Sequence, residues 1–360
     1  MSVSNLRFPD RVAHDFNQWA EMLNGSPLLC GHHDADGLSA LACLGRAWAI
    51  KHGSKPQMRI VGRGENAWTP EFADSLQDDL DGLVLLDLGA GQTRPTPAPL
   101  CVIDHHVPTQ DTQDSRLVLS GYGEEVVPST SLIAWWVAKG LIGSAADDLL
   151  WLAAVGAIGD MADRGFDIIN VAKKKYRVGK LREVVSLVNA PRRSASGDAR
   201  PALNWLLAAD DPADALLGNY LDREVCEAAR EEVKSATAQA RRAPPRFGSE
   251  YGSDLAIIRV DTPCQVHPLI AQSWAGRLKP AICFAANAEI EPGRVSFSGR
   301  TRGERSIINF LAEHAPENVD RSRYGNGHHK AAGGSLPVEQ WNAWVMELGF
   351  GTEVSVEPAD

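Results

Sequence analysis

The sequence predicts an α/β protein in which a parallel-sheet N-terminal domain is joined by a helical linker to a smaller α/β C-terminal domain. Up to about residue 190, short apolar runs typical of strands alternate with helical patterns, as in βαβ units. A mostly helical stretch follows and is broken at Pro244 and Pro245, after which a second mixed region begins. We therefore expect domains at residues 1–200 and 249–360, with the linker at 201–248.

The N-terminal region contains four apolar runs that are short enough to be buried strands. They are residues 26–31 (SPLLCG), 57–64 (QMRIVGRG), 82–89 (GLVLLDLG) and 99–106 (PLCVIDHH). Helical patterns lie at 39–53 and 129–142, and the apolar stretch 147–163 predicts a buried helix. Strands that alternate with helices in this way predict a parallel sheet.

The C-terminal region also mixes strand and helix patterns. We expect strands at residues 254–261 (DLAIIRVD), 280–289 (PAICFAANAE) and 294–301 (RVSFSGRT). We expect helices at 267–278 and 306–315. These five elements predict the smaller α/β domain.

The composition is typical of a globular cytoplasmic protein. The 360 residues are 44% hydrophobic and 23% charged, and we expect neither an apolar run of membrane-spanning length nor a signal peptide. The six cysteines are scattered without a CxxC pair, which predicts reduced core residues. The net charge of -10 argues against a protein that coats nucleic acid through its overall charge. A local basic cleft remains compatible with four basic stretches: 173–182, 192–193, 241–246 and 299–305.

Ionisable residues gather where the expected N-terminal strands end. Six of the ten histidines form three adjacent pairs: His32–His33, His105–His106 and His328–His329. Acids follow the expected strands or lie on a nearby helix: Asp34, Asp36, Asp87, Asp104 and Asp160. Parallel α/β sheets place ligand sites at the carboxyl ends of their strands. Because converging carboxylates repel one another and are costly to bury, divalent cations would remove both penalties.

Each of these features also has an ordinary structural explanation. A single aspartate after a strand is more often a helix N-cap or a turn residue than a metal ligand, and Asp36 before Gly37 would suit a turn. Four such elements in one sheet domain are much harder to explain as independent caps. Carboxylates with imidazoles and no cysteine suit Mn²⁺, with Mg²⁺, Co²⁺ or Zn²⁺ as alternatives.

The order of these motifs resembles that of the DHH phosphoesterase superfamily. The four matching motifs are HHDADG (32–37), LLDLG (85–89), VIDHH (102–106) and GAIGDMAD (156–163). The stretch GNGHHKAAGG (325–334) is similar to the glycine–histidine motif of the C-terminal domain associated with that superfamily, with Asn326 where the family pattern has its second glycine. The resemblance spans roughly residues 25–340 and implies a centre with two divalent cations.

The resemblance implies a role for each matching residue of the N-terminal domain. The expected metal ligands are His32, Asp34, Asp36, Asp87, His105 and Asp160. Asp87 would bridge the two ions, and Asp104 would ligate a metal or orient His105. His106 would face the substrate phosphate, stabilise its developing charge or protonate the leaving group. The expected catalytic residues are therefore Asp87, Asp104 and His106, and His33 has no assigned role.

In the C-terminal domain the resemblance implies a substrate-binding surface. The residues that match the glycine–histidine motif are Gly325, Gly327, His328, Gly333 and Gly334. Small residues would let backbone N–H groups approach a phosphate, and Arg300 in FSGRT resembles an arginine found at a similar place in relatives. Taken alone, a flexible turn and a surface arginine would explain the same residues. We expect the active site between the two domains.

These expectations point to a two-metal phosphodiesterase, a RecJ-like exonuclease acting on single-stranded DNA or RNA, with Mn²⁺ as the expected cofactor. The runner-up is a hydrolase of short oligonucleotides or linear dinucleotides, similar to the nanoRNases. A different class is a non-catalytic nucleic-acid-binding component of a replication or repair assembly. Such a protein would be expected to lose ligands, whereas every expected ligand position is occupied here. We expect no membrane partner, and both a monomer and a homodimer fit the sequence.

Overall fold

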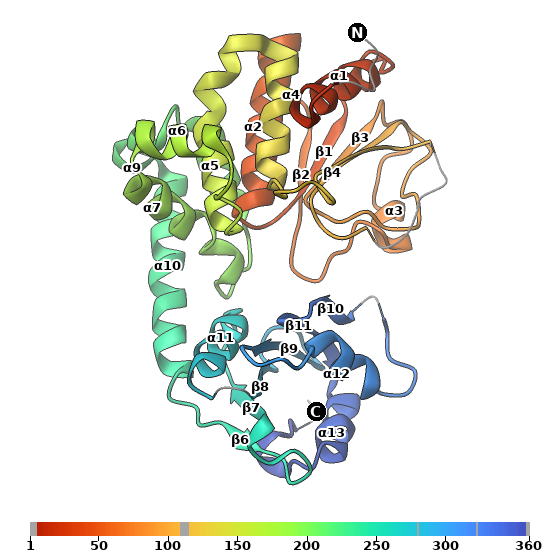
Figure 1. Cartoon of the computed structure of the whole chain (residues 1–360), viewed down its shortest axis with the longest axis vertical. Coiled ribbons are helices and arrows are strands. Elements are labelled where there is room, and N and C mark those ends of the chain that lie inside the picture. The colour runs from red at the N-terminus through yellow and green to blue at the C-terminus, as the bar shows by residue number, and fades with distance from the viewer. Residues whose placement is uncertain (1–5, 109–114, 279–280, 322, 358–360) are drawn as a thin grey trace. The chain divides into compact units, whose positions relative to one another are not determined.

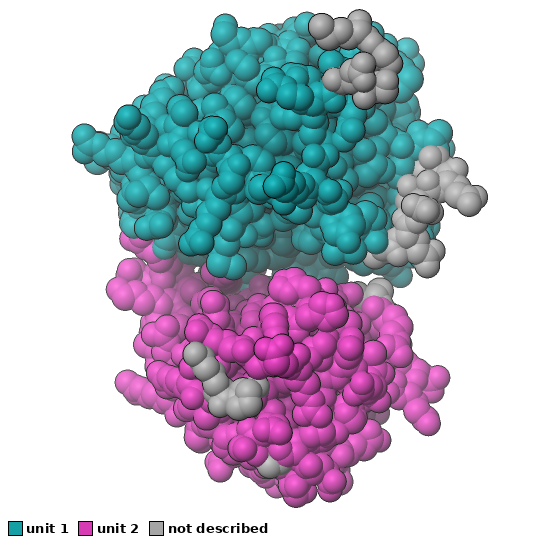
Figure 2. All heavy atoms as spheres, in the orientation of Figure 1, with its two compact units in different colours: residues 1–192, 198–228 teal, residues 193–197, 229–360 magenta. Residues whose placement is uncertain are grey.

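The chain forms two compact units, shown in Figures 1 and 2. The computed structural model describes residues 6–108, 115–278, 281–321 and 323–357. Unit 1 comprises residues 1–192 and 198–228, and unit 2 comprises 193–197 and 229–360. The chain passes from unit 1 to unit 2 within helix α10 (Leu221–Ala240). The α/β class predicted for both halves is confirmed.

Unit 1 is built on a five-stranded parallel sheet with the strand order β2-β1-β3-β4-β5. The strands are β1 (Leu28–His32), β2 (Met58–Val61), β3 (Leu83–Leu86), β4 (Leu100–Asp104) and β5 (Leu117–Ser120). The first four agree with the sequence prediction. The edge strand β5 was not predicted, because four residues with partial burial carry too little of a strand pattern.

Helices cover the sheet and bury its central strands completely (Figure 1). The larger apolar cluster packs the sheet against α1 (Phe8–Ala20), α2 (Ala35–His52), α4 (Thr130–Ile142) and α5 (Leu150–Gly159). A smaller cluster on the other face includes Phe72 of α3 (Pro70–Asp74). Alternate residues of β3 belong to the two clusters, as expected for a strand between two layers.

The apolar stretch Thr130–Gly159 has the length and hydropathy of a membrane span, contrary to our expectation that no such run exists. In the structure it contains α4 and α5 with a 3-10 segment, Gly143–Leu149, between them. Gly143 ends α4 with φ 57° and ψ −131°, a conformation that glycine adopts readily. The two helices pack against each other, and 61% of the apolar window is buried, as in the core helices of a globular unit.

The predicted helix at 147–163 is therefore shorter than expected, and further helices follow it. The basic stretch at 173–182 spans two helices, α6 (Asp167–Tyr176) and α7 (Val178–Val188). Two further helices, α8 (Arg200–Ala208) and α9 (Pro212–Leu217), lie between α7 and α10. All six cysteines of the chain are described, and each is buried and outside any disulfide, in agreement with the sequence prediction.

Unit 2 contains a six-stranded mixed sheet with the order β10-β11-β9-β8-β7-β6. The strands are β6 (Arg246–Phe247), β7 (Leu255–Val260), β8 (Ile282–Asn287), β9 (Arg294–Thr301), β10 (Tyr324–His328) and β11 (Ala331–Pro337). Helix α11 (His267–Arg277) packs on one face, and α12 (Ile307–Glu313) and α13 (Val338–Glu347) pack on the other. Only the pair β7–β8 is parallel among the strands of the described residues.

The stretch GNGHHKAAGG forms a β-hairpin, which the sequence analysis did not predict. β10 and β11 pair antiparallel, with Gly327 opposite Ala332 and His328 opposite Ala331. A methyl group on Gly333 would overlap the backbone carbonyl of Phe297 in β9, and one on Gly327 would overlap that of Ala331. These two glycines are therefore required for close approach of neighbouring strands.

We expect Gly333→Ala to lower the free energy of unfolding of unit 2 by about 1–3 kcal/mol, because the added methyl group overlaps backbone that cannot move independently. The control is Gly276→Ala in α11, where the nearest atom would be Arg302 Nη2 at 3.8 Å. It should be neutral or stabilising by up to about 1 kcal/mol. Thermal unfolding of both variants measures the difference. Equal stabilities would show that strand packing does not explain Gly333.

Candidate metal centre

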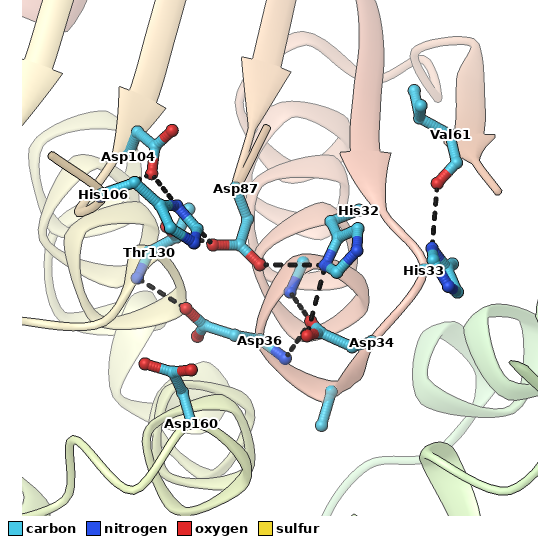
Figure 3. Close-up of polar contacts among 12 residues, drawn as sticks. His32, His33, Asp34, Asp36, Val61, Asp87, Asp104, His106, Thr130 and Asp160 are labelled. Atoms are coloured by element: carbon cyan, nitrogen blue, oxygen red, sulfur yellow. Dashed lines mark hydrogen bonds and ion pairs between the residues drawn. The ribbon is translucent and has the colours of Figure 1, made fainter. Parts of the chain in front are cut away.

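The strand order of unit 1 brings the predicted ligands to one edge of the sheet. The chain runs from β1 to its neighbour β2 and then to β3 on the other side of β1, so a topological switch point lies between β1 and β3. Open α/β sheets bind ligands at such a point, beyond the carboxyl ends of the strands. Figure 3 shows the side chains that follow β1, β3 and β4 converging there with Asp160, which ends α5.

Asp87 lies at the centre of this group and is only 4% exposed. Its Oδ2 is 3.5 Å from His32 Nδ1, and its Oδ1 is 3.4 Å from His105 Nε2. The hydroxyl of Thr130 donates to the same Oδ1 at 3.1 Å. Asp87 has a left-handed φ of 63°, which is uncommon for a residue other than glycine, although aspartate tolerates it better than most residues do.

A first group of potential metal ligands consists of His32, Asp34 and Asp87. Asp34 Oδ1 accepts the backbone N–H groups of Asp36 and Gly37 and so caps α2, while Oδ2 lies 3.2 Å from His32 Nδ1. Burial opposes the charge on both groups, but their mutual attraction outweighs it. The pKa of Asp34 is well below its usual range, and the pKa of His32 is raised to about 10.

A second group consists of Asp36, His105 and Asp160. His105 Nε2 is 3.6 Å from Asp160 Oδ2 and 4.0 Å from Asp36 Oδ2. Burial, followed by repulsion from Asp87, raises the pKa of Asp36 to about 7. Burial also raises the pKa of Asp160 to about 6, although His105 opposes the shift. The pKa of His105 is raised to about 10 by its acidic neighbours despite burial.

The donor set fits divalent cations. The ligand atoms of each group lie within 4.8 Å of one another, and a third group contains Asp87, Asp104, His105 and His106. Asp87 and His105 each belong to two groups, so neighbouring ions could share ligands. The donors are carboxylate oxygens and imidazole nitrogens without thiolates, as Mn²⁺, Mg²⁺ or Co²⁺ would require. Asp104 Oδ2 is buried and has no hydrogen-bond partner among the residues that the structure describes.

Asp104 orients the ring of His106, whereas the sequence-based prediction had it either ligate a metal or orient His105. The ring Nδ1 of His106 donates to Asp104 Oδ1 at 2.7 Å, and this contact raises the pKa of His106. The same oxygen accepts the backbone N–H groups of His105 and His106, and the pKa of Asp104 is lowered despite burial. The side chain of His106 remains 55% exposed, so its ring is oriented yet accessible to a substrate.

His33 does not belong to the metal-ligand groups. Its Nδ1 donates to the backbone carbonyl of Val61 at 3.2 Å, and Figure 3 shows the ring beside β2 and separate from the cluster of acids. Burial, assisted by the charge of His32, lowers its pKa to about 3, so the ring is neutral. His33 therefore acts as a buried structural contact between the first motif and β2.

The residues at the start of α4 also belong to the site, although they were not predicted. Asp36 Oδ2 accepts the backbone N–H of Thr130 at 2.8 Å, and Asp36 Oδ1 accepts that of Ser131 at 3.0 Å. The sequence around Ser129 indicates a helix N-cap, which the structure contains, but nothing local indicates that the next two residues hold an acid about a hundred positions earlier. Gly156 of α5 leaves the space that the Asp36 carboxylate occupies.

The predicted substrate-binding residues lie in unit 2, where the sheet brings two of them to one face. Arg300 of β9 is opposite Ala331 of β11, which is opposite His328 of β10. Directly opposed residues project from the same face of a sheet. Arg300 and His328 therefore lie on one face of this sheet, with strand β11 between them. Arg300 Nη1 donates to Ser298 Oγ and the Gly299 carbonyl, and burial lowers its pKa.

The glycines of the motif occupy β10 and β11. Gly325 has φ 77° and open space beside it, whereas Gly334, like Gly333 and Gly327, would overlap a neighbouring strand if it carried a methyl group. Sheet packing therefore accounts for three of the four glycines without a ligand.

Several solved structures share this fold. RecJ from Thermus thermophilus, solved with Mn²⁺, superposes with a TM-score of 0.70 at 19% identity, over 96% of this chain and 54% of RecJ. An exonuclease RecJ bound to manganese gives a TM-score of 0.68 at 20% identity, over 97% of this chain and 95% of the other. CDC45 from Entamoeba histolytica gives 0.56 at 11% identity, over 95% and 98%.

The chain therefore has a fold similar to that of RecJ, and it spans about half the length of the Thermus protein. No protein-family model and no curated protein sequence matches the chain. At these identities the likeness concerns the fold alone.

We expect the affinity for Mn²⁺ to rise between pH 6 and pH 8. In the metal-free protein Asp36 and Asp160 bind protons below about pH 7 and pH 6, and His32 and His105 remain protonated up to about pH 10. A cation must displace these protons, so a lower pH competes with binding. Calorimetry in two buffers with different ionisation enthalpies would count the protons released. An affinity that does not change with pH would contradict this ligand assignment.

We expect Gly156→Ala to weaken Mn²⁺ binding, because the added methyl group would lie 2.5 Å from Asp36 Oδ1 and would overlap Ser131 Oγ. It should also lower the free energy of unfolding by about 1–3 kcal/mol. Gly179→Ala on α7 is the control, since it would meet no atom within 4 Å. Metal titration and thermal unfolding distinguish the variants, and unchanged Mn²⁺ affinity in Gly156→Ala would show that the position of Asp36 is not critical.

Proposed function

We propose that this chain is a metal-dependent phosphoesterase that hydrolyses phosphodiester bonds of single-stranded nucleic acid, as a RecJ-like exonuclease. The single observation that carries the proposal is the overlap of the ligand groups at Asp87 and His105. Each of the three groups of acids and histidines contains the buried Asp87, its neighbour His105, or both. All three groups lie at one edge of a parallel sheet. A structural role would not require five aspartates to converge where burial and mutual repulsion oppose their charges.

The ligands would divide between two cations, and Asp87 would contribute to both because its Oδ1 lies 3.4 Å from His105 Nε2 of the second group. His32, Asp34 and Asp87 would hold one ion, and Asp36, His105 and Asp160 would hold the other. When bound, two such cations neutralise phosphoryl charge, orient the phosphate and lower the pKa of a water nucleophile. We propose Mn²⁺ as the physiological ion, with Mg²⁺ or Co²⁺ as alternatives, and manganese is the ion in two of the similar structures.

His106 is the group best placed to act on the substrate from this chain. Asp104 fixes its Nδ1 and raises its pKa, so the imidazole is protonated more readily than a free histidine. A protonated, exposed ring can donate to a phosphoryl oxygen or supply a proton to the leaving oxygen. Asp104 in turn accepts two backbone N–H groups, which hold the carboxylate in place.

Unit 2 would supply additional contacts to the nucleic acid. Arg300 and His328 share one face of its sheet, and both can donate hydrogen bonds to phosphate oxygens. One of the similar structures is an exonuclease, which supports a polynucleotide as substrate. The runner-up substrates are short oligonucleotides or linear dinucleotides, which the same centre would hydrolyse.

We expect Asp87→Ala to reduce turnover at least about a thousandfold, because one ligand group loses a member and His105 of the other group loses its nearest carboxylate. The variant should still fold, since the change removes a buried charge and not a packed apolar group. The matched control is Asp147→Ala, which removes an exposed acid paired with Lys139. End-labelled DNA and RNA, both long single strands and oligomers of two to five nucleotides, would be digested with Mn²⁺.

Stepwise shortening of long strands by the wild-type chain would establish the exonuclease and its polarity. Cleavage confined to the shortest oligomers would favour the runner-up. Binding without any cleavage would contradict an enzyme and favour a non-catalytic nucleic-acid-binding protein. Near-normal activity of Asp87→Ala would show that Asp87 does not bridge the ions.

A further inference from the structure

Arg192, in the basic stretch 192–193, lies beside the metal centre. It belongs to the short 3-10 segment Pro191–Arg193 after α7. Its Nε donates to Asn189 Oδ1 at 3.0 Å, and the same oxygen accepts the backbone N–H of Ala35 at 3.2 Å. Ala35 directly follows the ligand Asp34, so a single amide oxygen connects the guanidinium to the first metal-binding motif.

A second contact fixes the backbone of Arg192. Its carbonyl oxygen accepts a hydrogen bond from Arg63 Nη2 at 3.1 Å, and Arg63 lies in the loop just after β2. The last residue of β2, Val61, holds His33. The segment of Arg192 is therefore attached to the loop after β2 and to the start of α2, and His33 of the first motif contacts β2.

The remaining donors of the guanidinium are unused. Arg192 Nη1 and Nη2 have no hydrogen bond or ion pair with any residue in the described part of the chain. Yet the charge is close enough to the motif to lower the pKa of both Asp34 and His33. An arginine whose Nε is anchored and whose terminal nitrogens are free presents a planar fork that matches two phosphate oxygens.

We propose that Arg192 binds the substrate phosphate at the Asp34 side of the metal centre, through two non-bridging oxygens. The inference deepens the proposed function and rests on it for the identity of the substrate. It gives unit 1 a phosphate contact of its own, separate from Arg300 and His328 of unit 2. Arg192 is thereby a substrate-binding residue and not a metal ligand.

A structural role for Arg192 predicts a different result. If the residue served only to hold Asn189 and the start of α2, its removal would disturb Asp34 and weaken cation binding. If it binds phosphate, cation binding should change little, while phosphate affinity should fall. The two roles are therefore distinguished by measuring both ligands on the same variants.

The test is calorimetric titration of the full chain with Mg²⁺, and then with inorganic phosphate in the presence of Mg²⁺. Arg192→Ala should bind phosphate about 10- to 100-fold more weakly, as expected for the loss of a charged hydrogen-bonded contact. Arg192→Lys should recover only part of the affinity, because it restores the charge without the fork. Both variants should bind Mg²⁺ within about twofold of the wild-type chain.

Two further variants complete the experiment. Arg7→Ala is the matched control, since Arg7 is exposed and pairs with Asp10 in the first turn of α1. Arg300→Ala shows how much of the measured phosphate binding is due to unit 2. If Arg192→Ala does not fold, Arg192→Gln takes its place, with thermal unfolding as the criterion.

Phosphate affinity that is unchanged in Arg192→Ala, or a wild-type chain that binds no phosphate, would overturn the proposal. A parallel loss of Mg²⁺ affinity would overturn it as well, because it would indicate the structural role. With oligonucleotide substrates, the substitution should raise KM more than it lowers kcat. If phosphate binding depends on Arg192 but no phosphodiester is cleaved, the proposed function fails while the assignment of Arg192 stands.

Discussion

The candidate site depends on how the protein stabilises the negative charge of carboxylates that are buried at one edge of a parallel sheet. Four of the five acids are held by donors from the chain itself. Asp34 accepts the first N–H groups of α2, Asp36 accepts those of α4, and Asp104 accepts two N–H groups of the loop after β4. Asp87 accepts the hydroxyl of Thr130 and faces two imidazoles. Because amide donors and histidines share this task, the acids can keep their positions before any cation binds, and the centre is preorganised.

The helices around the site follow from the same constraint. Helix N-termini carry a partial positive charge, so directing α2 and α4 at acids stabilises their charged forms. For α5 to pack against this arrangement it must leave room for Asp36, and Gly156 provides that room. Gly37 has a similar role, because a methyl group there would overlap the backbone carbonyl of His32. The hydrogen bonds that stabilise the acids therefore require the helices and strands to approach closely, and Gly37 and Gly156 permit that approach.

The strand ends and their acids could be predicted from the sequence because both are local patterns. An apolar run followed by Asp87 or by Asp104 and two histidines shows the end of a strand and the chemistry placed there. The contacts of Thr130 and Ser131 with Asp36 could not be predicted, since they join residues 94 and 95 positions apart. The sequence also could not show which histidine ring Asp104 contacts, because the two adjacent histidines differ only in the direction of their rings. The hairpin of β10 and β11 was missed for another reason. Its glycines suggest a loop, and their need for close strand packing is visible only when β9 lies beside them.

The apolar pair of helices α4 and α5 has a consequence for the biosynthesis of the protein. Ribosomes make β1 to β5 before this pair, so the sheet exists as nascent chain while part of its covering layer is still missing. The segment Thr130–Gly159 then emerges as a stretch of 30 residues with the hydropathy of a membrane span. Until it packs onto α1 and α2, two complementary apolar surfaces are exposed on the same chain. Apolar surface exposed during synthesis favours aggregation and chaperone binding, so fast docking of the helical pair would shorten this exposure.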